Sequence, residues 1–429
     1  MRIMWICGGL LPEAYGALGM QDPRTNGGFM GSAFAAIKSR NVENQLCVLS
    51  WDARKCDVVV GNARHISFGG RFKETIKGVP IKYCLIAQKV IKEFAPDIIH
   101  ILGTEGIFAH LPKWVFDGRK TVVSMQGVIS ACALNYAGGL TRKDLRNTWF
   151  NCSFIRHGIS LSSDMRYWRE VRARLEADTI RRHNNFIGRT NFDLSWVHYY
   201  NPHANYYLVN ESMRPEFYNN ISRRKDGVRR HSIFCGGAAG YPLKGLHLAL
   251  RALVAIKKKY PDVQLRVANA IGLSGRISAG NYLRMGYYSL YLRRLIRELG
   301  LESAICCLPK LSAREVCEEL RSAEIFVLPS FCENSPNSLA EAMLIGTPAI
   351  AMDVGGVASM LTDNVSGRLV PSGDPAQLAQ AIENWFENKE FALQCAARAR
   401  TQALARHDPI KNAEVLLQTY NKIVENVYK

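Results

Sequence analysis

The chain has 429 residues, 48% of them hydrophobic and 21% charged, which is the composition of a globular protein of two or three domains. This composition excludes a disordered or collagen-like chain. Lys and Arg number 55 against 37 Asp and Glu. The resulting net charge of +18 predicts an anionic partner, such as nucleic acid, an acidic membrane surface or a phosphorylated substrate.

The start of the chain and its cysteines predict a cytoplasmic protein. The apolar run Arg2–Cys7 is too short for a signal peptide and ends at Gly8-Gly9, so we interpret it as a buried first strand. No stretch reaches the roughly 18 to 20 apolar residues of a membrane span. The 12 cysteines are scattered without a C-x-x-C pair, which is typical of reduced core residues rather than of a disulfide framework or a zinc ribbon.

Short apolar runs alternate with helical patterns along the chain. Strands are expected at Arg2–Cys7, Gln45–Ser50, Asp97–Leu102, Thr121–Ser124, Ser232–Cys235, Gln264–Ala268, Ile305–Leu308, Glu324–Leu328 and Ala349–Met352. Helices are expected at Gly245–Lys259, Tyr282–Leu299, Ala313–Arg321, Ala376–Phe386 and Ala413–Val427. This alternation predicts an α/β protein whose sheets are parallel and carry helices on both faces.

The alternation runs twice, and a polar stretch around Arg223–Gly227 lies between the two runs. It therefore predicts two doubly wound domains, at residues 1–210 and 211–410. The last amphipathic helix, within residues 411–429, can pack on either domain, and so can cross back to the first.

A basic, aromatic stretch at Gly139–Arg189 fits this scheme less well. On a helix, Trp168, Val171 and Leu175 would share one face while arginines crowd another. Two interpretations remain open: a packed helix with a solvated basic face, or a helix that lies on a membrane surface.

The block from Leu328 to Gly356 is the strongest chemical signal. A strand ends at Leu328, Ser335 suits a helix N-cap and Pro336 suits the first helical position. Gly346 is a natural helix end. The free amides at the start of this helix, from Asn337, Ser338 and Leu339, would form a phosphate site.

Glu333 and Glu341 can both reach a ligand at that helix start, because one precedes the helix and the other lies about one and a half turns inside it. Carboxylates accept paired hydrogen bonds from vicinal hydroxyls. The alternative is structural, with Glu333 as a cap and Glu341 as a solvated helix residue.

These residues resemble a known family. Seven residues separate Glu333 from Glu341, which matches the E-x7-E motif of the retaining, family 4-type nucleotide-sugar glycosyltransferases, including those of bacterial capsule and cell-surface polysaccharide. The resemblance implies the GT-B fold, in which two Rossmann-like domains face each other across a cleft. It implies that Glu333 binds the transferred sugar and supports the reacting centre, and that Glu341 binds the donor ribose. Residues around the diphosphate would be Asn334, Ser335, Asn337, Ser338 and Leu339.

The glycine-rich loop Phe234–Gly245 follows a strand and ends in Lys244, which suits a phosphate. Lys244-Gly245 resembles the family's K-G pair, and the resemblance implies that Lys244 neutralises the donor diphosphate. The family often carries an arginine about six residues earlier, where this chain reads Gly-Ala-Ala around Ala238. Another cation or the helix amides would have to replace that arginine.

The N-terminal half carries weaker matches. Gly27-Gly28 resembles the family's glycine turn, which approaches the donor phosphate or the acceptor, although an ordinary helix start is the alternative. The strand that carries Asp97 and His100 resembles the family's D-x-x-H, and we interpret both residues as structural. Its carboxyl end is the place where α/β sheets bind ligands, so its last residues are candidates for the acceptor side. These candidates are Thr104 and Glu105.

Gln126 stands where many relatives have a histidine that contacts the sugar. Gln can donate a hydrogen bond but does not titrate near neutral pH, so we expect donor contact and no role as a general base. Arg189 is a further acceptor-side candidate that would shape the cleft.

The chain has no D-x-D motif and no H-x-x-x-H pattern, so we expect a reaction without metal or cofactor, in which lysine and helix amides balance charge. The resemblance implies sugar transfer from a nucleotide-diphosphate sugar to a glycan or lipid-linked acceptor, in surface polysaccharide synthesis. It favours an anionic membrane surface over nucleic acid as the partner of the basic surface.

Three alternatives change the class of protein. A sugar-nucleotide epimerase with the same fold would consume the nucleotide sugar without an acceptor. A phosphorylase would need a cofactor lysine or a phosphate pocket that the sequence does not reveal. A non-catalytic basic scaffold would tolerate loss of both glutamates.

Overall fold

In the computed structural model, the described residues are 1–20, 28–40, 45–52, 54–69, 78–141, 143–144, 160–218, 222–224, 226–237, 239–270 and 272–425. The chain forms two compact units. Unit 1 comprises Met1–Ser130, Trp168–Met213 and His407–Lys429. Unit 2 comprises Ala131–Tyr167 and Arg214–Arg406. No helix in the described ranges is long and apolar enough to cross a membrane.

Unit 1 is built on a sheet with the strand order β3-β4-β2-β1-β5-β6-β7-β8, in which only β3 runs antiparallel to its neighbour. Its strands are β1 (Arg2–Cys7), β2 (Gln45–Ser50), β3 (Lys55–Val60), β4 (Ala63–Phe68), β5 (Ile98–Leu102), β6 (Lys120–Ser124), β7 (Asn185–Gly188) and β8 (Asn205–Leu208). Its helices are α1 (Pro12–Ala17), α2 (Gly28–Arg40), α3 (Ile81–Phe94), η1 (Ile107–His110), η2 (Lys113–Phe116), η3 (Trp168–Arg172), α8 (Ala173–Arg182), α9 (Asn191–Tyr200) and α17 (Pro409–Glu425). α4 (Ile129–Leu134) begins in unit 1 and ends in unit 2.

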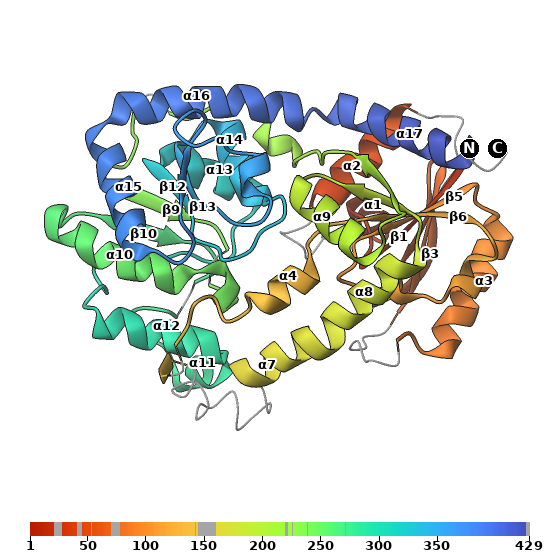
Figure 1. Cartoon of the computed structure of the whole chain (residues 1–429), viewed down its shortest axis with the longest axis horizontal. Coiled ribbons are helices and arrows are strands. Elements are labelled where there is room, and N and C mark those ends of the chain that lie inside the picture. The colour runs from red at the N-terminus through yellow and green to blue at the C-terminus, as the bar shows by residue number, and fades with distance from the viewer. Residues whose placement is uncertain are drawn as a thin grey trace. The chain divides into compact units, whose positions relative to one another are not determined.

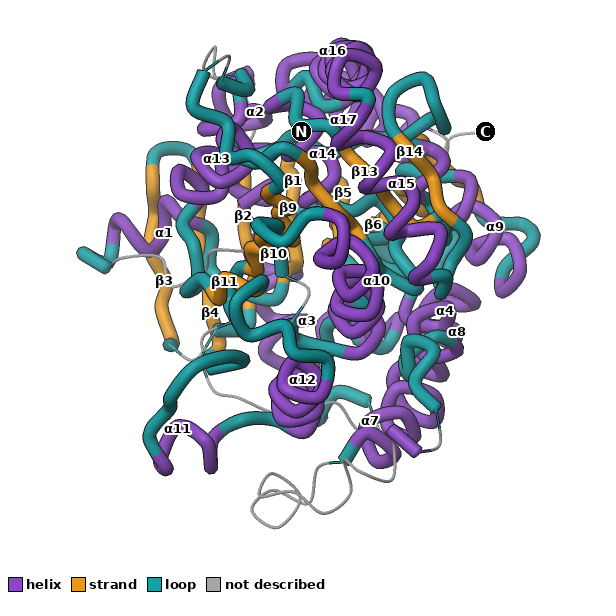
Figure 2. Tube along the Cα trace, turned by 90° about the vertical axis from the view of Figure 1, so that its left-hand side faces the viewer, coloured by secondary structure: helices purple, strands orange, loops and turns teal. Residues whose placement is uncertain are grey.

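The central strands of unit 1 are buried on both faces, which is why they read as continuous apolar runs in the sequence. β1 pairs in parallel with β2 and β5, with Ile3 opposite Leu46 and Ile98. β3 instead alternates exposed and half-buried residues at the edge of the sheet, beside α1 (Figure 2). Such an edge strand has a weak apolar signal, and the sequence did not predict it.

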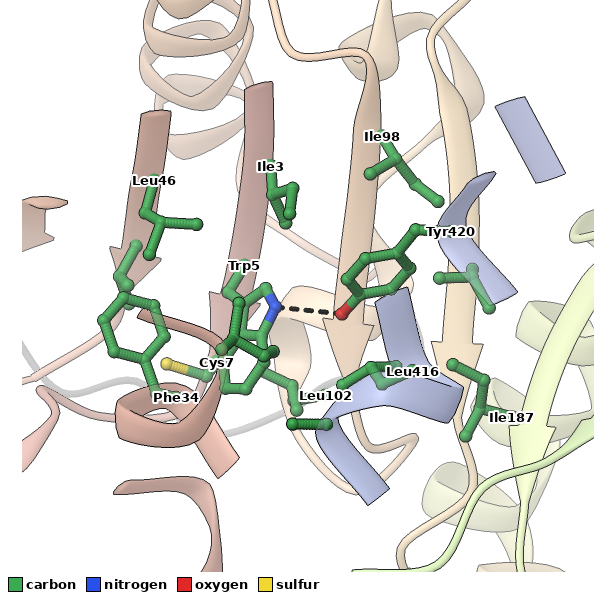
Figure 3. Packing of buried hydrophobic residues seen from close by; sticks show 14 of the residues in the cluster. Ile3, Trp5, Cys7, Phe34, Leu46, Ile98, Leu102, Ile187, Leu416 and Tyr420 are labelled. Atoms are coloured by element: carbon green, nitrogen blue, oxygen red, sulfur yellow. Dashed lines mark hydrogen bonds between the residues drawn. The ribbon is translucent and has the colours of Figure 1, made fainter. Parts of the chain in front are cut away.

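The last helix, α17, belongs to unit 1 and packs with α2 against the sheet (Figure 1). Trp5 Nε1 donates a 3.0 Å hydrogen bond to the hydroxyl of Tyr420 (Figure 3). That hydroxyl also lies 2.6 Å from Nδ1 of His100, whose burial lowers its pKa to about 3. His100 is thus neutral and packed, as expected, and Asp97 accepts from the amide of Arg2.

Unit 2 is built on a parallel sheet with the strand order β11-β10-β9-β12-β13-β14. Its strands are β9 (Ser232–Cys235), β10 (Gln264–Val267), β11 (Ile305–Cys307), β12 (Ile325–Leu328), β13 (Ala349–Met352) and β14 (Arg368–Val370). Its helices are α7 (Leu161–Tyr167), η4 (Pro215–Phe217), η5 (Pro242–Lys244), α10 (Leu246–Lys259), α11 (Ala279–Arg284), α12 (Tyr287–Glu298), α13 (Ala313–Ser322), α14 (Asn337–Ile345), η6 (Val357–Ser359), α15 (Pro375–Glu387) and α16 (Lys389–Arg406). α10 and α12 lie on one side of the strands, and α13 and α14 lie on the other (Figure 1).

The prediction of two doubly wound α/β domains is confirmed. Like β3, the strands β4, β7, β8 and β14 were not among the expected strands. Two expected features also differ in the structure. The helix expected at Tyr282–Leu299 is broken into α11 and α12 at Met285-Gly286. The stretch Ala131–Tyr167, expected within residues 1–210, belongs to unit 2.

Side-chain contacts explain why Ala131–Tyr167 belongs to unit 2. Tyr287, on α12, donates a 3.0 Å hydrogen bond to Asp164, and its hydroxyl lies 3.4 Å from that of Tyr136. His247 Nε2, on α10, lies 2.7 Å from the carbonyl oxygen of Gly138. These contacts link residues more than 100 positions apart, so no local pattern reveals them.

Within the basic stretch, residues 161–182 form α7, η3 and α8 in succession. Residues 142 and 145–159 of this stretch lie outside the described residues. Leu175 is buried, and the guanidinium of Arg172 lies 4.2 Å from the ring centroid of Trp168. Neither Trp168 nor Val171 is fully exposed. The structure therefore favours the packed helix over the membrane-surface helix.

Candidate functional site

The site in unit 2 begins at the glycine-rich loop after β9. Gly245 has φ of +71°, and a Cβ at this position would lie 1.8 Å from the carbonyl oxygen of Pro329, at the end of β12. Only glycine allows this approach of two backbones. It places Lys244, the residue before Gly245, next to the loop that follows β12.

Lys244 and Glu333 form an ion pair at the carboxyl ends of β9 and β12. Nζ of Lys244 lies 2.6 Å from Oε1 of Glu333, and Ser330 Oγ donates to the same oxygen at 2.7 Å. Burial lowers the pKa of Lys244, but the charge and hydrogen bond of Glu333 outweigh that effect and raise it overall. Lys244 is therefore a cation at neutral pH, and it remains one-third exposed.

α14 starts one residue later than the sequence predicts. Its N-cap is Pro336, and Ser335 Oγ instead donates to the sulfur of Met360 at 3.3 Å, so the prediction of Ser335 as N-cap is wrong. A proline N-cap offers no side-chain acceptor to the first amides. The amide of Leu339 donates to the carbonyl of Pro336 at 3.0 Å, so it is not free for a ligand as expected.

Within the described part of the chain, the amides of Asn337 and Ser338 have no acceptor. They lie at the N-terminus of a nine-residue helix, which favours an anion. Asn334 and Ser335, by contrast, are buried beneath this helix start. The expected phosphate site therefore rests on two amides instead of three.

Glu341 is a buried residue, so its interpretation as a solvated helix residue is wrong. Arg214 Nη2 lies 2.6 Å from its Oε1. The interpretation of Glu333 as a helix cap also does not describe its contacts, because its carboxylate accepts hydrogen bonds from Lys244 and Ser330. The sequence did not predict Arg214 or Ser330 at the site.

The stretch after α4 packs tightly on the same loops. A Cβ on Gly138 would lie 2.2 Å from the carbonyl oxygen of Pro242, and one on Gly139 would lie 3.0 Å from the ring of Phe331. Cys132 Sγ lies 4.0 Å from Cys332 Sγ, and this contact and burial raise the pKa of the Cys132 thiol. Residues from the N-terminal half of the chain thus line the Lys244–Glu333 site.

In unit 1, Glu105, Gln126 and Arg189 come together after β5, β6 and β7. The amide of Gly127 donates to Oε1 of Glu105, and Arg189 Nη2 donates to the carbonyls of Met125 and Gln126. Burial raises the pKa of Glu105 to about 7. Arg189 also forms an ion pair with Glu211.

The remaining candidates in unit 1 are Thr104, Gly27 and Gly28. Thr104 is fully buried and donates to Glu176 at 2.7 Å, which gives it a structural contact. Gly28 opens α2, while Gly27 lies outside the described residues. Ala238, in the glycine-rich loop of unit 2, also lies outside them.

The arrangement in unit 2 combines a cation, two helix amides and two carboxylates. The cation and amides suit a diphosphate, and the carboxylates suit sugar or ribose hydroxyls. The two parallel-sheet α/β units belong to the GT-B class of fold.

Residues 229–402 match the family described as glycosyl transferases group 1. A D-inositol 3-phosphate glycosyltransferase of Paenarthrobacter aurescens is 26% identical over 258 residues, which are 59% of this chain and 59% of the relative. The protein of the same description from Corynebacterium kroppenstedtii is 30% identical over 43% of this chain and 41% of its own. The chain thus spans about half the length of the curated relatives it matches.

Solved structures share the fold. A sucrose-phosphate synthase from Thermosynechococcus elongatus has a TM-score of 0.70 at 14% identity, covering 99% of this chain and 100% of its own. The Anabaena protein HepE, in complex with UDP and glucose, has a TM-score of 0.66 at 14% identity, covering 98% and 99%.

Proposed function

We propose that the chain is a retaining glycosyltransferase that moves a sugar from a nucleotide-diphosphate sugar to an acceptor hydroxyl. The observation that carries this proposal is the Lys244–Glu333 pair beside the first amides of α14, within the region of the family match. A cation and helix amides can stabilise a leaving diphosphate, and the carboxylate beside them can accept a hydrogen bond from a sugar hydroxyl.

In this mechanism Lys244 and the amides of Asn337 and Ser338 stabilise the charge that develops on the diphosphate as the glycosidic bond lengthens. Glu333 accepts hydrogen bonds from the transferred sugar and supports the reacting centre. The acceptor hydroxyl attacks from the face that the diphosphate leaves, and a donor phosphate oxygen takes its proton. Glu341 holds the ribose of the nucleotide.

Unit 1 supplies the acceptor side in this proposal. Glu105 binds an acceptor hydroxyl, and Arg189 fixes the neighbouring loop through the carbonyls of Met125 and Gln126. Thr104 contributes only by holding Glu176.

We infer that the acceptor carries phosphate. The names of the relatives, D-inositol 3-phosphate glycosyltransferases, favour a small phosphorylated polyol. A lipid-linked or glycan acceptor of surface polysaccharide synthesis is the other source of a phosphate group. The net charge of +18 is compatible with either acceptor. Assays with inositol phosphate and with a polyprenyl-phosphate-linked sugar separate the two.

A panel of nucleotide sugars tests the function. We expect one of the UDP-, GDP- or ADP-sugars to raise the melting temperature and to release its nucleoside diphosphate only when an acceptor is present. An epimerase would convert the donor without acceptor, and a scaffold would release nothing. We further propose that the reaction needs no divalent metal, so that transfer persists in excess EDTA.

We also propose a cytoplasmic protein that contacts an anionic membrane surface through α3. Ile81, Leu85 and Ile86 are exposed by 64%, 54% and 43%. Trp114 lies beside α3, because the side chain of Gln88 donates a hydrogen bond to its carbonyl oxygen. Trp114 is 43% exposed. Exposed lysines flank this apolar face, which suits an acidic lipid surface. They are Lys82, Lys89, Lys92 and Lys113.

A further inference from the structure

Among the residues that the structure describes, Glu341 has one cationic partner, Arg214, at the point where the chain enters unit 2 for the second time. Arg214 precedes the short helix η4, and its guanidinium lies 5.0 Å from the ring centroid of Phe217. Its Nη2 lies 2.6 Å from Oε1 of Glu341, and both side chains are at most 15% exposed. The ion pair is thus largely shielded from water.

The charge of Glu341 depends on this partner. Burial raises the pKa of Glu341, and the nearby carboxylate of Glu216 raises it further. Arg214 acts in the opposite direction through its charge and its hydrogen bond. Removal of Arg214 would leave a buried carboxyl group beside a second acid, which favours the neutral form.

The ionisation state decides what Glu341 can bind. An ionised carboxylate accepts hydrogen bonds on both oxygens, whereas a neutral carboxyl group must donate on one of them. Arg214 engages Oε1, and Oε2 has no hydrogen-bond partner among the residues that the structure describes. Oε2 is therefore available to a ligand hydroxyl only while the group remains ionised and fixed.

We propose that Arg214 is a positioning residue for nucleotide recognition: it keeps Glu341 ionised and oriented to accept hydrogen bonds from the donor ribose. This inference rests on the proposed function, which places the ribose at Glu341. The competing explanation is a structural ion pair that ties the start of η4 to α14 and has no effect on ribose recognition.

Calorimetric titration distinguishes the two. The probe is whichever of UDP, GDP and ADP binds most tightly, titrated beside its 2′-deoxy form between pH 6 and pH 8.5. The variants are Arg214→Met, which removes the charge, Arg214→Gln, which keeps polar donors, Arg214→Lys, which keeps the charge, and Glu341→Gln. Arg224→Met is the matched control, because Arg224 pairs with Glu318 at 2.7 Å on the surface of the same unit.

We expect the wild-type protein to prefer the ribonucleotide by about tenfold, since a hydrogen bond to a charged group is lost in the deoxy form. Arg214→Met and Glu341→Gln should reduce this preference to less than about twofold. Arg214→Lys and Arg224→Met should retain most of it.

The ribonucleotide preference is also measured as a function of pH, because a purely structural ion pair would leave this pH dependence unchanged. Because ribose binding needs the ionised form, the preference should fall as pH decreases through the raised pKa of Glu341. In Arg214→Gln that fall should occur at higher pH. Comparing ribo and deoxy forms at each pH cancels the titration of the phosphates themselves.

Suppose that folded Arg214→Met and Arg214→Gln keep the wild-type ribonucleotide preference and pH profile, while Glu341→Gln loses the preference. This result would overturn the proposed role of Arg214 and leave the ribose at Glu341. An unchanged preference in Glu341→Gln would instead remove the ribose from Glu341, and binding of none of the three nucleotides would overturn the proposed function itself.

Discussion

Nζ of Lys244 lies 2.6 Å from Oε1 of Glu333, although 89 positions separate the two residues in the chain. The pair joins the loop after β9 to the loop after β12, neighbouring strands in the sheet of unit 2. In the proposed mechanism, the donor diphosphate must share or replace the Glu333 carboxylate as the partner of Lys244, which links donor binding to the group proposed to contact the transferred sugar.

Replacing Lys244 by Met should weaken binding of the nucleoside diphosphate by about 10- to 100-fold, because a charge-assisted contact is lost. Calorimetric titration measures this change. Lys389→Met is the control, since Lys389 forms a 2.8 Å ion pair with Glu324 in the same unit but outside the site. Equal affinities of wild type and Lys244→Met would remove Lys244 from the phosphate site.

Gly245→Ala should destabilise unit 2 by more than about 3 kcal/mol, since it adds a backbone clash to the cost of a left-handed conformation. A Cβ here would lie 1.8 Å from the Pro329 carbonyl oxygen. Gly237 is the matched control: its φ is +67°, but a Cβ there meets nothing within 4 Å, so Gly237→Ala should cost only about 1 to 2 kcal/mol. Urea unfolding monitored in unit 2 measures both, and equal costs would contradict the tight approach of the two loops.

Glu105→Gln should stabilise the protein at pH 8 but not at pH 5. Burial raises the pKa of Glu105 to about 7 from an ordinary value of 4.5, so the folded state holds its proton more tightly than the unfolded state between these values. Stability from this group is therefore present at low pH and lost as pH rises through 7. Gln keeps the acceptor for the Gly127 amide without the charge.

We expect a gain on the order of 1 to 2 kcal/mol at pH 8, allowing for the partial exposure of Glu105. Thermal unfolding of both proteins at pH 5 and pH 8 measures it. The same difference at both values would show that Glu105 does not titrate in this range.

The α3 surface should bind vesicles that contain anionic lipid. Flotation with phosphatidylcholine vesicles, with and without about 30% phosphatidylglycerol, should recover wild-type protein only with the anionic lipid. Leu85→Ser with Ile86→Ser should abolish recovery, because these side chains form the apolar face. Leu393→Ser with Leu404→Ser is the control, since both residues are exposed on α16. Equal flotation of the two double variants would place the membrane contact elsewhere.

The sequence predicts well those parts of the fold whose signal is local. Central strands such as β1 and β9 are buried on both faces, and the helix that carries Glu341 is the next element after the apolar strand β12, so apolar runs and spacing reveal them. The edge strand β3 alternates exposed and half-buried residues, and its weaker pattern went unpredicted.

The partners of the site residues could not be predicted, because they come from distant positions. Arg214 and Glu341 are 127 positions apart, and Cys132 and Cys332 are 200 apart. The shift of the helix start from Ser335 to Pro336 has a different cause. Ser335 is buried and donates to the sulfur of Met360, a tertiary contact that replaces the local cap.

The most direct test of the proposed transfer is the turnover of Glu333→Gln, which keeps the shape of the side chain and removes its charge. With the best-binding nucleotide sugar and a phosphate-bearing acceptor, wild type should form product with the donor's anomeric configuration, read by proton NMR. Glu333→Gln should bind the nucleoside diphosphate but turn over on the order of 100-fold more slowly. Unchanged turnover in that variant, or product of inverted configuration from the wild type, would contradict retaining transfer at the Lys244–Glu333 site.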